Sequence, residues 1–184
     1  MKKLLNPVAH FDERKLLVVG LASVVLNLAI GYFFDFRMVS VLKFAPVATS
    51  FDRLVLFTLR AYLVAIAVFY LYGWLINRKT RFLDVVNAVL ISTIPGMLVC
   101  PFQRIPFFSK TLERMLENPQ EAVPSDMTIL MLFAVLMLPF VIYQIVLLFN
   151  DFKTATHMKA WYHVFLFFVL LLSTAFFTPF IFKL

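Results

Sequence analysis

The chain alternates between long apolar runs and short polar segments. Five runs define the pattern: Leu16–Phe34, Leu54–Ile76, Phe82–Phe102, Met127–Phe149 and Trp161–Phe182. Each contains 19 to 23 residues and at most one charged side chain. Because an α-helix rises about 1.5 Å per residue, each run can cross the roughly 30 Å hydrocarbon core of a bilayer. The pattern predicts an all-α integral membrane protein, a bundle of five transmembrane helices over about 16–34, 54–76, 82–102, 127–149 and 161–182.

The segments between the runs are too short for a soluble domain, so residues 1–184 are predicted to form a single polytopic membrane domain. Its connections are a short N-terminal tail (1–15), a partly apolar first loop (34–51), an outer loop (103–126) and a fourth connection (150–160). In the outer loop, apolar residues recur at helical spacing: Phe108, Leu112, Met115 and Leu116. This predicts a short amphipathic helix near 107–118 at the membrane interface. Such a helix is either a lid or docking surface, or a simple covering for the end of the bundle.

Composition and charge fit this class, since 62% of the residues are hydrophobic and 15% are charged. The net charge of +7 comes from Lys and Arg dispersed among short loops. These residues are expected to anchor helix ends in the lipid bilayer and to set topology, and no nucleic-acid partner is predicted. Nine of them fall on the side of the N-terminal tail and seven on the other. This bias predicts a cytoplasmic N-terminus and an external C-terminus, in a bacterial cytoplasmic (inner) membrane.

Small and polar residues recur four apart on one face of the first and third predicted helices: Ser23, Asn27, Gly31, Ala88, Ser92 and Gly96. This spacing lets helix backbones approach closely, so both faces are expected to be buried in the bundle. Pro95 lacks a backbone N–H, which predicts a kink in the third helix near residues 92–96.

Several of these residues fall at a similar depth in the outer half of the bundle. Together they form a candidate polar pocket of Asn27, Arg60, Ser92, Pro95, Gly96 and Thr174. Arg60 is the most unusual member, because a charge inside a span is costly and often marks a functional site. The alternative is that its side chain extends to the outer surface and contacts lipid headgroups. Helix packing is the corresponding alternative for the small residues.

Catalytic chemistry is not indicated. No acidic residue lies near the centre of a predicted span. His10, His157 and His163 have no metal-ligand spacing and no Cys or carboxylate clustered with them. The sequence also lacks a phosphate-binding loop and an evident nucleophile–base pair. We therefore predict that the protein is not an enzyme and has no metal site and no cofactor.

Three stretches of the chain resemble the YIP family, named for membrane proteins that interact with Ypt/Rab GTPases. The first stretch is the tail from Leu5-Asn6-Pro7 to Phe11. The second runs from Gly73 through the basic turn at Arg81-Phe82-Leu83-Asp84 to Pro95-Gly96. The third comprises Tyr143-Gln144-Ile145-Val146-Leu147-Leu148, Phe152-Lys153-Thr154-Ala155-Thr156 and Lys159-Ala160. In order and spacing the chain is similar to a short prokaryotic member with five spans.

The resemblance implies a non-enzymatic membrane scaffold or adaptor that assembles with membrane-protein partners or with itself. Eukaryotic members use a long cytosolic N-terminal region, whereas this tail has about fifteen residues, which argues against GTPase binding. The alternative function is a small transporter or channel component that uses the polar pocket. The resemblance supplies no catalytic residues.

Overall fold

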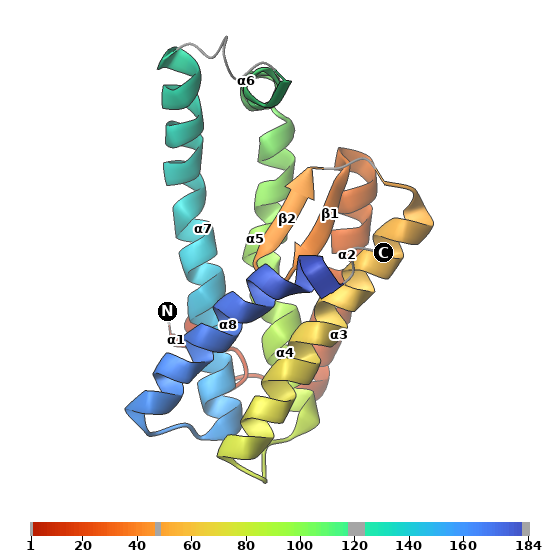
Figure 1. The fold of residues 1–184 in the computed structure, drawn as a ribbon. Coiled ribbons are helices and arrows are strands. Elements are labelled where there is room, and N and C mark those ends of the chain that lie inside the picture. Colours follow the sequence, from red (N-terminus) through yellow and green to blue (C-terminus); the bar gives the residue numbers. More distant parts are fainter. Residues whose placement is uncertain (1, 47–48, 118–123, 182–184) are drawn as a thin grey trace.

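The computed structural model describes residues 2–46, 49–117 and 124–181, and it is an all-α membrane bundle with one small strand pair (Figure 1). Five helical segments within these ranges are long and apolar enough to cross a membrane, which confirms the predicted fold class. They are α2 (Glu13–Phe34), α3 (Phe51–Ile76), the consecutive α4 (Phe82–Ser92), α5 (Ile94–Val99) and η1 (Cys100–Arg104), α7 (Pro124–Thr156) and α8 (Trp161–Ile181). A four-residue helix, α1 (Lys2–Leu5), precedes them.

The third span is interrupted where the sequence predicts a kink. Helix α4 ends at Ser92 and α5 begins at Ile94, one residue before Pro95. Because Pro95 has no N–H to donate, the regular hydrogen-bond ladder cannot continue through it. Beside the break, the Thr93 hydroxyl donates to the Leu90 carbonyl oxygen at 2.8 Å. The break lies in the interior, since α4 is buried on most sides.

The predicted small-residue faces of α2 and α4 pack against each other. Ser23 and Asn27 are buried, and the Ser23 hydroxyl lies 3.4 Å from the Leu90 carbonyl oxygen of α4. A Cβ on Gly20 would fall 2.9 Å from Leu90 Cβ, so this crossing tolerates only glycine at its closest point. The expectation that both faces are buried is confirmed for the first helix and for Ala88 and Ser92, while Gly96 is partly buried.

The first loop differs from its prediction. Residues 36–46 form an antiparallel hairpin of β1 (Phe36–Ser40) and β2 (Lys43–Pro46), which turns back among the helices (Figure 1). Phe36, Met38 and Ser40 are almost fully buried. Within a bilayer, non-helical backbone is tolerated only where its polar groups are paired and the protein surrounds it. The strand pairing and the burial of β1 meet both conditions for that strand, whereas β2 is exposed at its two ends.

Helix α7 is longer than its apolar run. Its 33 residues rise about 50 Å, more than the roughly 30 Å core requires. The prediction that residues 150–160 form a connection is therefore wrong for 150–156, which are helical, and the turn is confined to 157–160. The extra turns stay helical because Asp151 and Phe152 are buried against other segments rather than exposed to water.

The predicted amphipathic helix is present as α6 (Pro106–Glu117). It lies across the end of the bundle and is seen end-on in Figure 1. The centroid of its Phe108 ring lies 4.6 Å from that of the Phe133 ring of α7. The side chains of residues 112–117, and Asn118 at the predicted helix end, lie outside the described residues. At the opposite end, Phe69, Phe152 and Phe167 form a buried aromatic cluster with centroids 5.3 to 5.6 Å apart.

Candidate functional site

A chain of polar side chains connects three helical elements in the middle of the bundle. The Tyr62 hydroxyl of α3 lies 2.9 Å from Thr93 Oγ1, between α4 and α5. Asn27 Nδ2 of α2 donates to the Tyr62 hydroxyl at 3.3 Å and also lies 3.4 Å from Met38 Sδ of the hairpin. Because Thr93 Oγ1 already donates to the Leu90 carbonyl, Tyr62 is the donor in the shared bond. All of these side chains are buried, so the network ties the hairpin to the kink.

Neither of the two cavities described in this part of the bundle is lined by all six residues of the predicted pocket. Asn27 belongs to the network, and Ser92 and Pro95 lie within two residues of Thr93 in the sequence. Gly96 lines a cavity of about 190 Å³ between the hairpin, α5 and α7. Thr174 lines a separate apolar cavity of about 170 Å³ between α3 and α8, where its hydroxyl donates to Leu171 of its own helix. Arg60 is half-buried on α3 and lines neither cavity.

Two residues of this region are absent from the predicted pocket although the sequence carries a signal for one of them. Gln144 is almost fully buried on α7, and its Nε2 donates to the Val41 carbonyl oxygen at the hairpin turn, at 2.5 Å. A glutamine within a 23-residue apolar run is itself a sign of an internal polar contact. Lys43 follows that turn and lines the 190 Å³ cavity with Gln144. From the sequence, Lys43 was expected only to be one of the basic loop residues that anchor helix ends.

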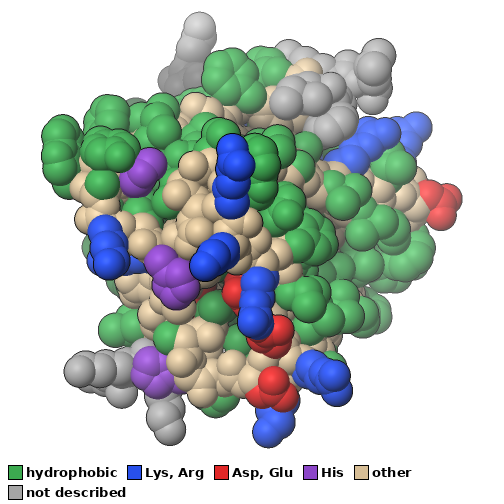
Figure 2. All heavy atoms as spheres, turned by 90° about the horizontal axis from the view of Figure 1, so that it is seen from below, with side chains coloured by type: hydrophobic (Ala, Val, Ile, Leu, Met, Phe, Trp, Pro, Cys, Tyr) green, Lys and Arg blue, Asp and Glu red, His purple; other side chains and the backbone are tan. Residues whose placement is uncertain are grey.

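A second polar region lies at the end of the bundle that Figure 2 views from below. We call it the lower face: the tail (4–13), the turn between α3 and α4 (77–84) and the end of α7 with its connection (150–160). Charged and His side chains gather on this face among hydrophobic ones (Figure 2). It holds a cavity of about 450 Å³ lined by Asn6, Asn150, Lys153, Thr154, His157, Met158 and Lys159.

The tail is held on the lower face by hydrogen bonds to α7. Asn6 Nδ2 donates to Thr154 Oγ1 at 2.8 Å, and the Val8 backbone N–H donates to Asp151 Oδ1 at 3.1 Å. Asn150 Nδ2 donates to the Leu5 carbonyl oxygen at 2.9 Å. Asp151 is fully buried, and among the described residues its Oδ2 has no hydrogen-bond partner. The tail therefore covers a carboxylate that would otherwise meet solvent.

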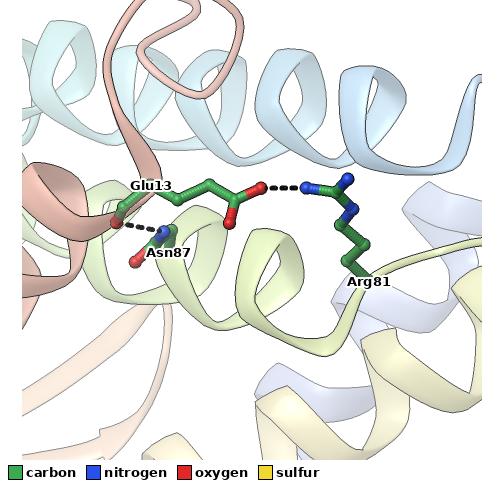
Figure 3. Close-up of polar contacts among 3 residues, drawn as sticks. All are labelled: Glu13, Arg81 and Asn87. Carbon is green, nitrogen blue, oxygen red and sulfur yellow. Dashed lines mark hydrogen bonds and ion pairs between the residues drawn. The ribbon is translucent and has the colours of Figure 1, made fainter.

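The turn between α3 and α4 joins the same surface. Asn77 Nδ2 lies 3.4 Å from the Thr156 carbonyl oxygen at the end of α7. Arg81 of the turn pairs with Glu13 at the end of the tail (Figure 3). The backbone carbonyl oxygen of Glu13 also accepts a 3.2 Å hydrogen bond from Asn87 Nδ2. The tail, the turn and the end of α7 are thus connected pairwise through side chains.

Comparisons with known proteins give no match for this chain among family models, curated proteins or solved structures. Its function must therefore be inferred from the two polar regions. The central network is internal and joins helices to the hairpin. The lower face is exposed and combines segments that lie more than 140 residues apart in the sequence.

Proposed function

We propose that the protein is a non-enzymatic integral membrane scaffold or adaptor of the YIP type, which uses its lower face to bind membrane-protein partners or a second copy of itself. The observation that carries the proposal is the convergence of the three YIP-like stretches on that face. Asn6 of the first stretch bonds to Thr154 of the third. Asn77 of the second lies on the same face, with its Nδ2 3.4 Å from the Thr156 carbonyl oxygen of the third.

The side chains of the lower face favour binding over reaction. Asn6 and Asn77 use their amide groups to hold the tail and the turn against the end of α7. Around them, Phe82 and Leu83 are exposed beside charged groups, a mixture typical of protein interaction surfaces. The transporter alternative finds less support, because Asn27 of the predicted pocket already donates to the Tyr62 hydroxyl within the bundle.

The proposed location is a bacterial cytoplasmic membrane, with the lower face and N-terminus in the cytoplasm. This orientation follows from the excess of Lys and Arg on the N-terminal side. An odd number of crossings places the two ends of the chain on opposite sides. Reporter fusions at Met1 and Leu184 should therefore report from different compartments, and signals from the same side would contradict the arrangement.

Site-specific photo-crosslinking in native membranes tests the scaffold role. A photoreactive residue at Leu83, on the lower face, should give one discrete protein adduct, either a second copy or another membrane protein. The matched position is Phe165, an exposed residue of α8, which should crosslink to lipid only. Lys159→Glu, a charge reversal on the lower face, should weaken the Leu83 adduct.

Two outcomes would contradict the proposal. One is an identical, lipid-only pattern at Leu83 and Phe165. The other is solute flux in liposomes that Arg60→Ala abolishes while the variant inserts normally, because this would favour the transporter instead. Identification of the adduct by mass spectrometry separates self-association from a distinct partner.

A further inference from the structure

A lysine lies partway along the bundle, on its surface, because the hairpin turns inward. The turn is held by Gln144, whose Nε2 donates to the Val41 carbonyl oxygen, and Lys43 follows two residues later. Along the apolar run of α7, Gln144 lies 17 residues from Met127 and five from Phe149, which corresponds to about 25 Å and 8 Å. Both ends of this run lie beyond the level of Gln144, so Lys43 starts from a backbone position inside the membrane region.

The Lys43 side chain is exposed to a cavity of about 190 Å³. Gln144 adds a second polar group to the lining, and α7 supplies an apolar wall of Phe133, Met137, Phe140 and Val141. The lining on α7 extends from Gln144 to Phe133, eleven residues or about 16 Å. At its far end, the Phe133 ring packs against Phe108 of α6. The cavity therefore has a cationic end and an elongated apolar part.

No carboxylate neutralises this lysine within the described part of the chain. The two ion pairs described there are Glu13–Arg81 and Asp35–Arg104, both partly exposed near helix ends. A charge at membrane depth is retained where it meets water or an opposite charge, and such residues mark binding sites and pathways. An apolar wall beside one convergent cation matches a ligand with one negative charge and one hydrocarbon chain.

We propose that this cavity binds a single-chain anionic amphiphile taken from the bilayer, with its carboxylate or phosphate monoester at Lys43 and its chain along the α7 wall. Gln144 sets the position of the hairpin and thus of the cation. The proposal concerns a different region from the lower face and does not depend on the scaffold role. It assigns a ligand class to a cavity that the sequence did not identify.

Native mass spectrometry of the full chain, released from a neutral detergent and titrated with dodecanoate, tests this site. Wild-type protein should bind one dodecanoate. Dodecanol, which has the same chain without the charge, and acetate, which has the charge without the chain, should each bind far more weakly. Lys43→Met should weaken dodecanoate binding roughly tenfold to a hundredfold, the range for one lost charge-assisted hydrogen bond.

Three further variants control the result. Lys43→Arg should retain binding, because the charge is kept, and Lys110→Met should leave it unchanged, because Lys110 lies on α6 and does not line the cavity. Val141→Trp should weaken binding by filling the apolar wall. Equal binding of dodecanoate and dodecanol by wild-type protein, or unchanged binding by Lys43→Met, would overturn the proposal. The comparison of the two ligands needs no variant, so it decides the matter even if a substitution prevents folding.

Discussion

Tyr62→Phe removes a single oxygen from the centre of the polar network and isolates its contribution to stability. The hydroxyl accepts from Asn27 Nδ2 at 3.3 Å and donates to Thr93 Oγ1 at 2.9 Å, so two hydrogen bonds are lost while the ring stays in place. Hydrogen bonds between membrane helices contribute about 0.6 kcal/mol on average and about 1.7 kcal/mol at most. The two together predict a loss of roughly 1–2 kcal/mol in the free energy of unfolding, since the Asn27 donor keeps only the weak Met38 sulfur acceptor.

The measurement is equilibrium unfolding in mixed micelles, in which a denaturing detergent is titrated against a mild one. Tyr70→Phe is the matched control, because no hydrogen bond of the Tyr70 hydroxyl is found among the described residues, and it should change stability by less than about 0.5 kcal/mol. A double-mutant cycle with Thr93→Val should give a coupling energy of at least about 0.5 kcal/mol, as expected for side chains in contact. Equal effects of Tyr62→Phe and Tyr70→Phe would refute the reasoning.

Three further predictions concern packing and the lower face. Gly96→Ala should destabilise the protein by about 1–3 kcal/mol in the same unfolding assay, because the new methyl group would overlap Gln144 Oε1; wild-type stability would show that the hairpin yields freely. Asn6→Ala should release the tail from Thr154 and speed its cleavage by protease added on that side, and an unchanged cleavage rate would argue against docking. Arg81→Gln should cost less than about 1 kcal/mol, because its ion pair is exposed, and a larger loss would mean that the pair is shielded from water.

The sequence predicted the five helices because each depends on properties within one run. Apolar length decides whether a segment can cross a bilayer, and a missing N–H decides where a helix breaks. The start of the third span at Phe82 and the break beside Pro95 therefore fall where they were predicted. Burial of one face of α2 was predictable for the same reason, because Ser23 and Asn27 share a helical face whatever their partner is.

The hairpin and the long α7 depend on partners far away in the chain. The strands at 36–46 have no strong alternation in the sequence, and their inward position depends on Gln144, 103 residues after Val41. The charge of Asp151 favoured a loop in the prediction. In the structure it is buried by the tail, where Val8, 143 residues earlier, donates to it. For the candidate pocket, depth could be estimated from each span, but the rotation of α3 and α8 that separates Arg60 and Thr174 from the network could not.

The hairpin also imposes an order on biogenesis. Its turn is secured by a glutamine that the ribosome delivers about a hundred residues after the turn itself, when three spans have already been synthesised. Until then, the Val41 carbonyl oxygen lacks this donor, so the half-made chain must keep the turn in contact with water rather than lipid. Nascent chains halted before Gln144 should therefore leave Lys43 open to water-soluble amine reagents. Synthesis of the fourth span should lower the reactivity of the Lys43 amine toward them.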